Sequence, residues 1–170
     1  MYLKNSRLTK KGGMTIVELT IACGVLFAVV LGMFEMLHTG QRAWSISAAG
    51  MDINAVSRQA MYRMSRELSQ AGRATIFINN DTLSFQMPSG ISSGAVTWGN
   101  PVQYARGGVD GRQLLRTEAG TQTILANEVT QLLFTRPAAD TVAIAMTLSK
   151  QSPRGDVATL QVSSQVRVRN

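Results

Sequence analysis

Glu18 has the clearest chemical consequence in this 170-residue sequence, because it lies at the start of a long apolar stretch. No charged residue follows it from Leu19 to Phe34. A carboxylate at the centre of a membrane span costs about 2.5–3.5 kcal/mol on insertion scales, so we expect Glu18 to have a partner of opposite charge. In a medium of low dielectric constant, such an ion pair fixes the register of two segments more strongly than apolar packing does.

Other side chains that commonly act in catalysis or metal binding are few. Cys23 is the only cysteine and lies in the apolar stretch, while His38, at the edge of that stretch, is the only histidine. The sequence therefore allows no intrachain disulfide and no multi-histidine metal site. No nucleophile has a recognisable base beside it, so we predict that the protein is not an enzyme and has no cofactor. Four aspartates lie in turn-like segments without forming a dense calcium loop, and they leave calcium binding open: Asp81, Asp110, Asp140 and Asp156.

The formal charge of +7 is unevenly distributed along the chain. Four basic residues and no acidic residue lie within residues 1–13, which leaves a formal charge of only +3 for the rest. The modest charge of the remaining chain argues against a nucleic-acid partner. The four basic residues are Lys4, Arg7, Lys10 and Lys11.

The apolar segment that must position Glu18 comprises residues 14–37. As a helix of 1.5 Å per residue it would measure roughly 36 Å, which exceeds a bilayer core of about 30 Å. The basic residues before it favour a cytoplasmic N-terminus, so that the bulk of the chain faces outward. The sequence therefore predicts a single-pass membrane segment.

The helical pattern continues as an amphipathic helix over residues 38–72. The segment from Thr39 to Ala71 contains no proline, and small and apolar residues recur every three or four positions. Gly72 predicts the helix end, since glycine adopts the left-handed conformation without steric cost. We therefore expect one helix of roughly 55 residues, far longer than most globular helices. Its apolar stripe is expected to consist of Trp44, Ala48, Met51 and Ala55, followed by Met61, Met64, Leu68 and Ala71.

Residues 73–170 consist of short runs of β-type residues separated by turn residues, which is typical of a β-sheet domain. Val142–Leu148 alternates between large apolar and small residues, as a sheet with one buried face requires. Because about 100 residues do not readily form two packed layers, we expect an α+β fold in which the long helix packs on an antiparallel sheet. Ser89–Gly94 is the expected mobile loop, and Pro88-Ser89-Gly90 is read as a turn. Strands are expected at Thr75–Ile78, Thr82–Met87, Val102–Tyr104, Gln113–Arg116, Gln131–Arg136, Val142–Leu148 and Val157–Arg169.

The junction between the basic and apolar segments resembles the signal of type IV prepilins and type II secretion pseudoprepilins. The resemblance is carried by Lys10-Lys11-Gly12-Gly13-Met14-Thr15-Ile16-Val17-Glu18-Leu19 and the apolar run that follows. In that family a membrane peptidase cuts after a glycine and methylates the new terminal amine, and a glutamate is the fifth mature residue. The resemblance implies cleavage between Gly13 and Met14, N-methylation of Met14, and an ion pair between Glu18 and the terminal amine of another subunit. Met14 departs from the phenylalanine that usually begins the mature chain.

Later segments are similar to minor members of this family. Met61–Gly72 is similar to the helix end of the J-type minor pseudopilin and W-type minor pilins, and Val166–Asn170 is similar to their closing strand. Glu35 stands where major members commonly have a proline. The resemblance implies that residues 1–13 are a removed leader, and that the chain crosses the inner membrane once with a cytoplasmic N-terminus and a periplasmic domain over residues 73–170. The implied partners are other pilin-like subunits at a filament tip, the prepilin peptidase and methyltransferase, and an inner-membrane assembly platform.

Alternative functions stay open at this point. The same features fit a minor pilin of a type IV pilus, used in adhesion, motility or DNA uptake, as well as a type II secretion pseudopilus. A membrane-anchored periplasmic DNA-binding protein would show affinity that falls steeply with salt. A secretory signal, a lipoprotein site at Cys23 and a plain signal anchor account less well for Glu18 in a run that continues to Leu37. The DNA-binding alternative would use Arg106, Arg112, Arg116 and Arg154.

Overall fold

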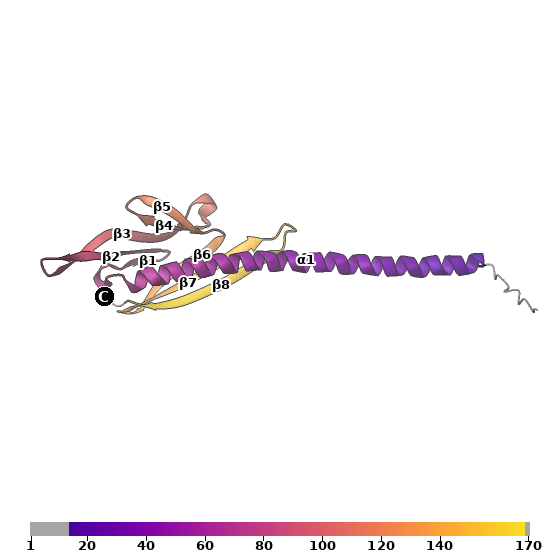
Figure 1. Cartoon of the computed structure of the whole chain (residues 1–170), viewed down its shortest axis with the longest axis horizontal. Helices are drawn as coiled ribbons and strands as arrows, with labels where there is room; N and C mark the ends of the chain where they lie inside the picture. Colours follow the sequence, from indigo (N-terminus) through magenta and orange to yellow (C-terminus); the bar gives the residue numbers. More distant parts are fainter. Residues whose placement is uncertain (1–13, 169–170) are drawn as a thin grey trace, which may run out of the picture. The chain divides into compact units, whose positions relative to one another are not determined.

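A computed structural model describes residues 14–168 of the chain. Figure 1 shows one long helix, α1 (Ile16–Ser69), followed by a domain built of β-strands. The chain has two compact units, the first ending at Arg42 and the second beginning at Ala43. The prediction of a single long helix is confirmed, since α1 has 54 residues.

In the first unit, the described chain is the N-terminal part of α1 and the two residues before it. Every residue from Met14 to Arg42 is exposed, including the large apolar side chains. No proline occurs in this part of the chain, so the helical hydrogen-bond ladder is not interrupted. The apolar surface of this unit has no covering within the described residues.

The second unit combines the rest of α1 with two antiparallel sheets. The larger sheet has the strand order β1-β2-β3-β4-β5 and the smaller one the order β6-β7-β8, so both are simple meanders. A short 3₁₀ helix follows α1 at Arg73–Thr75, and another joins β3 to β4 at Val109–Gly111. The strands are β1 (Phe77–Asn79), β2 (Thr82–Ser92), β3 (Ala95–Gly107), β4 (Gln113–Glu118), β5 (Thr121–Ala126), β6 (Val129–Ala138), β7 (Thr141–Gln151) and β8 (Val157–Arg167).

One hydrophobic core joins α1 to both sheets. The buried positions of the helix recur every three or four residues and therefore form a single face. On β7, the large residues from Val142 to Leu148 are buried and the residues between them are half-buried, which confirms the predicted alternation. The predicted α+β fold class, with the long helix packed on antiparallel β-structure, is confirmed. The buried helix residues are Ala49, Ile53, Ser57, Ala60, Met64 and Leu68.

The first half of the expected apolar stripe is wrong. Trp44 and Met51 are 76% and 68% exposed, whereas Ala49 and Ile53 are buried. Small and apolar residues lie on several faces of this part of α1, so their spacing alone does not identify the face that meets the sheets. The second half of the expected stripe is confirmed at Leu68, which is fully buried together with Met64 and Ala71.

The helix also ends differently from the expectation. Gly72 has φ −76° and ψ 127°, an extended conformation, and it is not a left-handed cap. The last turn tightens instead, because the amide of Ala71 donates to the carbonyl of Leu68 at 3.1 Å. The Gly72 amide donates to the carbonyl of Gln86 in β2 at 3.0 Å. A contact with the sheet therefore ends the helix, and the expected backbone freedom of glycine is not used.

The β-domain differs from expectation in its number of strands and sheets. Residues expected to form one sheet form two, and β5 was not expected at all. The expected mobile loop Ser89–Gly94 is wrong, because β2 continues to Ser92 and a two-residue turn leads directly into β3. Pro88 is paired with Trp98 inside the ladder, with register shifts on both sides. Pro88 therefore marks a bulge, where the missing amide of proline is tolerated.

Candidate functional site

A capping box forms the start of α1 and involves Glu18. The Thr15 amide donates to Oε2 of Glu18 at 3.1 Å, and the Thr15 hydroxyl lies 3.3 Å from the same oxygen. The Glu18 amide donates in return to the Thr15 hydroxyl at 3.2 Å. Two amides that the helix would leave without partners are thereby satisfied. The carboxylate also lies in the first turn, where the helix dipole favours a negative charge.

This local role of Glu18 was not among the expectations from the sequence. The signal was present as Thr15-x-x-Glu18 directly before an apolar run, which is the pattern of a capping box. Glu18 therefore already has hydrogen-bond partners within its own chain. Gly13, the residue expected before the cleaved bond, lies outside the described residues. Met14, the expected first mature residue, is 65% exposed.

The apolar surface beyond Glu18 is long enough to cross a bilayer. The most apolar 18-residue window of α1 has a mean hydropathy of 2.4, and none of it is buried within the described chain. Cys23 and Glu35 are both exposed in this region. By its length and composition, α1 is the one candidate membrane span in the described part of the chain, and it lies near the N-terminus.

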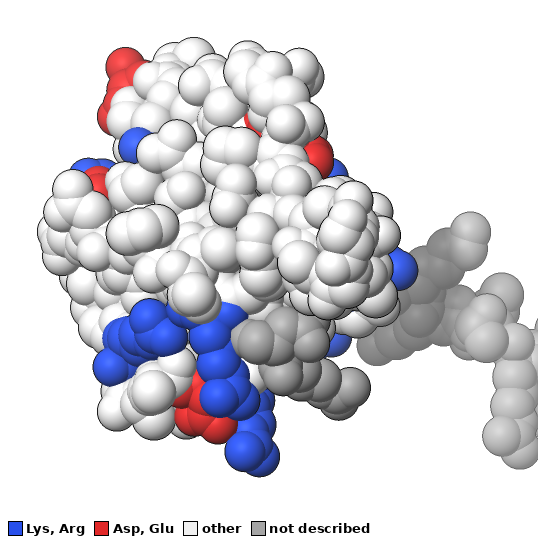
Figure 2. All heavy atoms as spheres, turned by 90° about the vertical axis from the view of Figure 1, so that its left-hand side faces the viewer, with Lys and Arg blue, Asp and Glu red and all other residues white. Residues whose placement is uncertain are grey.

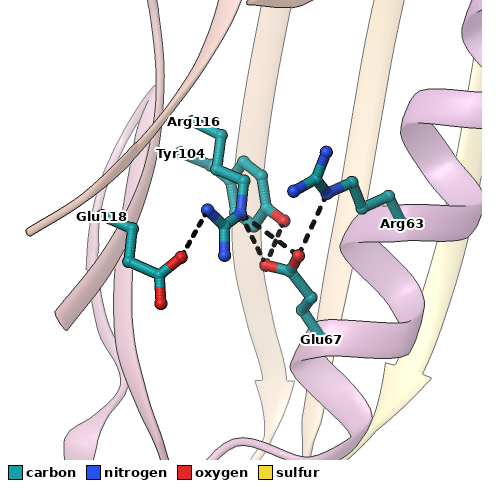
Figure 3. A network of polar contacts seen from close by, with 5 residues as sticks. All are labelled: Arg63, Glu67, Tyr104, Arg116 and Glu118. Carbon is teal, nitrogen blue, oxygen red and sulfur yellow. Dashed lines mark hydrogen bonds and ion pairs between the residues drawn. The ribbon is translucent and has the colours of Figure 1, made fainter. Parts of the chain in front are cut away.

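A polar cluster in the second unit surrounds Glu67, near the C-terminal end of α1 (Figure 3). Arg116 of β4 donates through Nε to both carboxylate oxygens of Glu67, at 3.1 and 3.0 Å. The Tyr104 hydroxyl of β3 donates to Oε2 at 2.7 Å. Arg63, one helical turn before Glu67, donates to Oε1 at 3.1 Å. Arg116 in turn pairs through Nη1 with Glu118 at 2.7 Å.

Burial and hydrogen bonding shift the pKa of Glu67 in opposite directions. Burial raises the pKa of this carboxyl, but hydrogen bonds from Tyr104, Arg116 and Arg63 outweigh it and leave the pKa below its ordinary value. Burial and the adjacent Glu67 carboxylate both raise the pKa of Tyr104. The Glu67 carboxylate is therefore charged at neutral pH and is held by three donors. Because these groups bind one another, the cluster joins α1 to β3 and β4 and does not offer a free general base.

Arg63 and Glu67 are hydrogen-bonded to each other, but the two side chains differ in their exposure to solvent. The side chain of Glu67 is only 14% exposed, whereas that of Arg63 is 44% exposed. The other partners of Glu67, Tyr104 and Arg116, are 37 and 49 residues further along the chain. No local pattern in the sequence could have indicated these pairings. The position of Glu67 beside the buried residues Met64 and Leu68 was only a weak indication that its side chain turns toward the domain.

Trp98 of β3 covers Gly72 in the second unit. A Cβ atom added at Gly72 would collide with the indole ring of Trp98. The absence of a side chain at Gly72 therefore allows the ring to lie against the backbone. Trp98 is still 39% exposed, and it lines a hollow on the β2–β3 hairpin together with Pro88, Ile91 and Val96.

The arginines of the DNA-binding alternative do not all lie at the surface. Arg116 is buried between Glu67 and Glu118. Arg112 forms an ion pair with Glu128 at 2.8 Å, and it also donates to the carbonyl of Ser149. Arg106 donates to the carbonyl of Thr130, and Arg154 lies in the turn between β7 and β8. The charge of the buried Arg116 is thus matched by two acidic neighbours, Glu67 and Glu118.

The residues considered for metal binding are not brought together. Among residues 14–168, no group of three or more His, Cys, Asp and Glu side chains is arranged to hold a metal ion. His38 is exposed on α1. Asp140 pairs with Arg167 at 2.9 Å, and this hydrogen-bonded ion pair lowers the pKa of Asp140.

Comparisons of the chain with protein-family models, with curated proteins and with solved structures found no match.

Proposed function

We propose that this chain is the precursor of a minor pilin-like subunit of a type II secretion pseudopilus. Removal of residues 1–13 by a prepilin peptidase would leave Met14 as a methylated N-terminus. Residues 14–37 would hold the subunit in the inner membrane, with the N-terminus cytoplasmic and the β-domain periplasmic. The subunit would then join other pilin-like subunits at the tip of a filament and prime its assembly.

The observation that carries this proposal is the form of α1. The first unit presents apolar side chains on every side of the helix, and its only acidic residue before Glu35 is Glu18, in the first turn. The second unit packs its part of the same helix on two sheets. An exposed apolar helix without an internal partner needs either lipid or other helices around it. A subunit that moves from a membrane into a helical filament core would be surrounded first by lipid and then by other helices.

The capping box defines what Glu18 could do in such a filament. The Thr15 amide and hydroxyl already hold Oε2 of Glu18, so the carboxylate has a fixed orientation at the helix start. Cleavage after Gly13 would place a positive amine on Met14, one residue before Thr15. The amine of a neighbouring subunit could then pair with Glu18, and in a low-dielectric filament core the pair would set the register between subunits.

Intact-mass analysis of the purified membrane form tests the proposal. In cells with an active prepilin peptidase, we expect a mass that lacks residues 1–13 and carries one methyl group on Met14. The same chain in cells without that peptidase should retain Met1. A chain that retains residues 1–13 when the peptidase is active would rule out the proposed maturation.

A further inference from the structure

The two sheets have four edge strands, and β8 is the long open one. β1 has only three residues and β5 only six. The outer side of β6 is engaged, because the Phe134 amide donates to the carbonyl of Asn80 at 3.1 Å and the Val129 amide to the carbonyl of Arg112 at 2.9 Å. β8 has 11 residues, and its only strand partner within the described chain is β7.

The ladder between β7 and β8 shows which backbone groups of β8 lie at this open edge. At one end the Val168 amide donates to the carbonyl of Asp140, and beyond the other end the Ser152 amide donates to the carbonyl of Asp156. Bonded and non-bonded residues alternate along an antiparallel pair, so every second residue of β8 points its amide and carbonyl away from β7. All six of these residues are exposed: Val157, Thr159, Gln161, Ser163, Gln165 and Arg167.

β8 has little of the protection that natural edge strands usually carry. Its 11 residues pair with β7 without a register shift, whereas the β2–β3 and β6–β7 pairs both contain shifts. It contains no proline and no lysine, and Arg167 is its only charged residue. Charged residues, proline and bulges are the common means of preventing strand addition at an edge. A regular edge without them is suited to pairing with another strand.

A groove with a positive end lies beside the C-terminal half of β8. Ser65 and Ser69 of α1 and the following Arg73 line one side, and Ser164–Val168 line the other. Arg73 donates through Nε to the carbonyl of Val168, which holds its guanidinium at the groove. A guanidinium has five donor hydrogens, so Arg73 retains donors for a second acceptor.

Further charged residues meet at the same end of the second unit. Arg136 donates through Nη2 to the carbonyls of Arg73 and Ala139. Arg167 pairs with Asp140, so three arginines are grouped with one aspartate. Figure 2 shows basic side chains gathered on this face beside an acidic one. The excess positive charge favours a negatively charged group on whatever occupies the groove.

We propose that β8 is a docking edge for an extended segment of a partner protein, which adds as a further antiparallel strand and brings a carboxylate to Arg73 and Arg167. Antiparallel addition continues the pattern of the β6-β7-β8 sheet. In this orientation the carboxylate belongs near the N-terminal end of the added segment. β8 itself contains no acidic residue, so the β8 strand of a second copy would not supply that carboxylate. The proposal does not depend on the filament role.

A synthetic peptide as long as β8 provides the probe. It alternates threonine and valine, has blocked ends, and carries aspartate as its second residue; the control peptide carries lysine there. Amide exchange of the full chain in detergent micelles is followed by NMR with and without peptide. We expect slower exchange at the outward amides of β8, while the alternate amides that already bind β7 change little. The aspartate peptide should bind about five-fold more tightly than the lysine peptide, as one partly exposed ion pair allows.

Two variants separate docking from folding. Gln165→Pro removes an outward amide and should abolish peptide binding while the β7–β8 ladder remains. Ser164→Pro removes an amide that bonds to β7 and should lower the thermal stability of the domain instead. A third variant, Arg73→Glu, lies outside the strand and tests the charge preference. It should reverse the preference for the aspartate peptide, so that the lysine peptide binds more tightly.

Three results would overturn the proposal. One is unchanged exchange at the outward amides when either peptide is present at millimolar concentration. Another is equal affinity for the two peptides in both the unaltered chain and the Arg73→Glu variant. The third is protection of these amides without peptide, together with a dimer in sedimentation, since a second copy would then occupy the edge.

Discussion

At the scale of single residues, Glu18 combines a capping role with the pairing role proposed above, and a substitution by alanine would remove both together. Its carboxylate caps the start of α1 through Thr15. Under the proposed function, its charge also pairs with the terminal amine of a neighbouring subunit. Glutamine is also found at this position of a capping box, because its side-chain oxygen accepts the same hydrogen bond. The charge and the cap can therefore be tested separately.

We predict that Glu18→Gln abolishes filament assembly, whereas Thr15→Ala leaves assembly largely intact. The glutamine variant keeps the cap and loses the negative charge, while the alanine variant weakens the cap by about 1 kcal/mol and keeps the charge. Assembly is measured as the amount of each variant recovered in sheared filaments, with membrane levels as the control. Normal assembly of Glu18→Gln would show that the charge has no role in register.

Glu67 is the second residue whose role can be tested alone. Its pKa in the folded protein is lower than the ordinary value of 4.5. The contacts of this carboxylate therefore stabilise the fold fully above that pH, and their contribution is lost as the pH falls through the folded-state pKa. We expect the stability of the domain to decline on acidification below about pH 4.5, and we expect a shallower decline in Glu67→Gln.

At neutral pH, Glu67→Gln should lower the free energy of unfolding by about 3 kcal/mol, because it leaves the buried Arg116 with only Glu118 as an acidic partner. Arg63→Ala is the matched control. It removes an exposed pair of the same carboxylate and should cost no more than about 0.5 kcal/mol. Denaturant unfolding of the two variants measures the difference. Equal losses would contradict the view that Arg116 is the main partner of Glu67.

At the scale of elements, the connection between α1 and β2 depends on Gly72 and Trp98. We predict that Gly72→Ala lowers the free energy of unfolding by about 1–3 kcal/mol, because the added methyl group would collide with the indole ring. In a Trp98→Ala background the same glycine substitution should cost much less. A double-mutant cycle measured by thermal unfolding isolates this coupling. Additive effects of the two substitutions would show that the ring does not restrict position 72.

At the scale of the whole molecule, folding of the β-domain should not require the first unit. Within the described part of the chain, the buried hydrophobic residues of the core lie between Ala49 and Val168. We predict that a chain consisting of residues 43–170 folds with a melting temperature within a few degrees of that of the full chain. Circular dichroism and thermal unfolding provide the measurement. A fragment that fails to fold cooperatively would show that the first unit contributes to the core.

The β-domain was only partly predictable from sequence. The alternation of Val142–Leu148 indicated β7 correctly, because one face of that strand is buried and the pattern shows it. β5 gave no such signal, because most of its residues are exposed and its pairing with β4 defines it. Pro88 indicated a turn, yet the pairing with β3 accommodates it as a bulge.

The long helix, its apolar first part and the capping pattern at Thr15 and Glu18 are encoded locally, because they depend on residues within one or two turns of each other. Tertiary structure alone decided the division into two sheets, the helix end at the contact of Gly72 with Gln86, and the Glu67 cluster. These features pair residues that are distant along the chain, and no local pattern encodes such pairings.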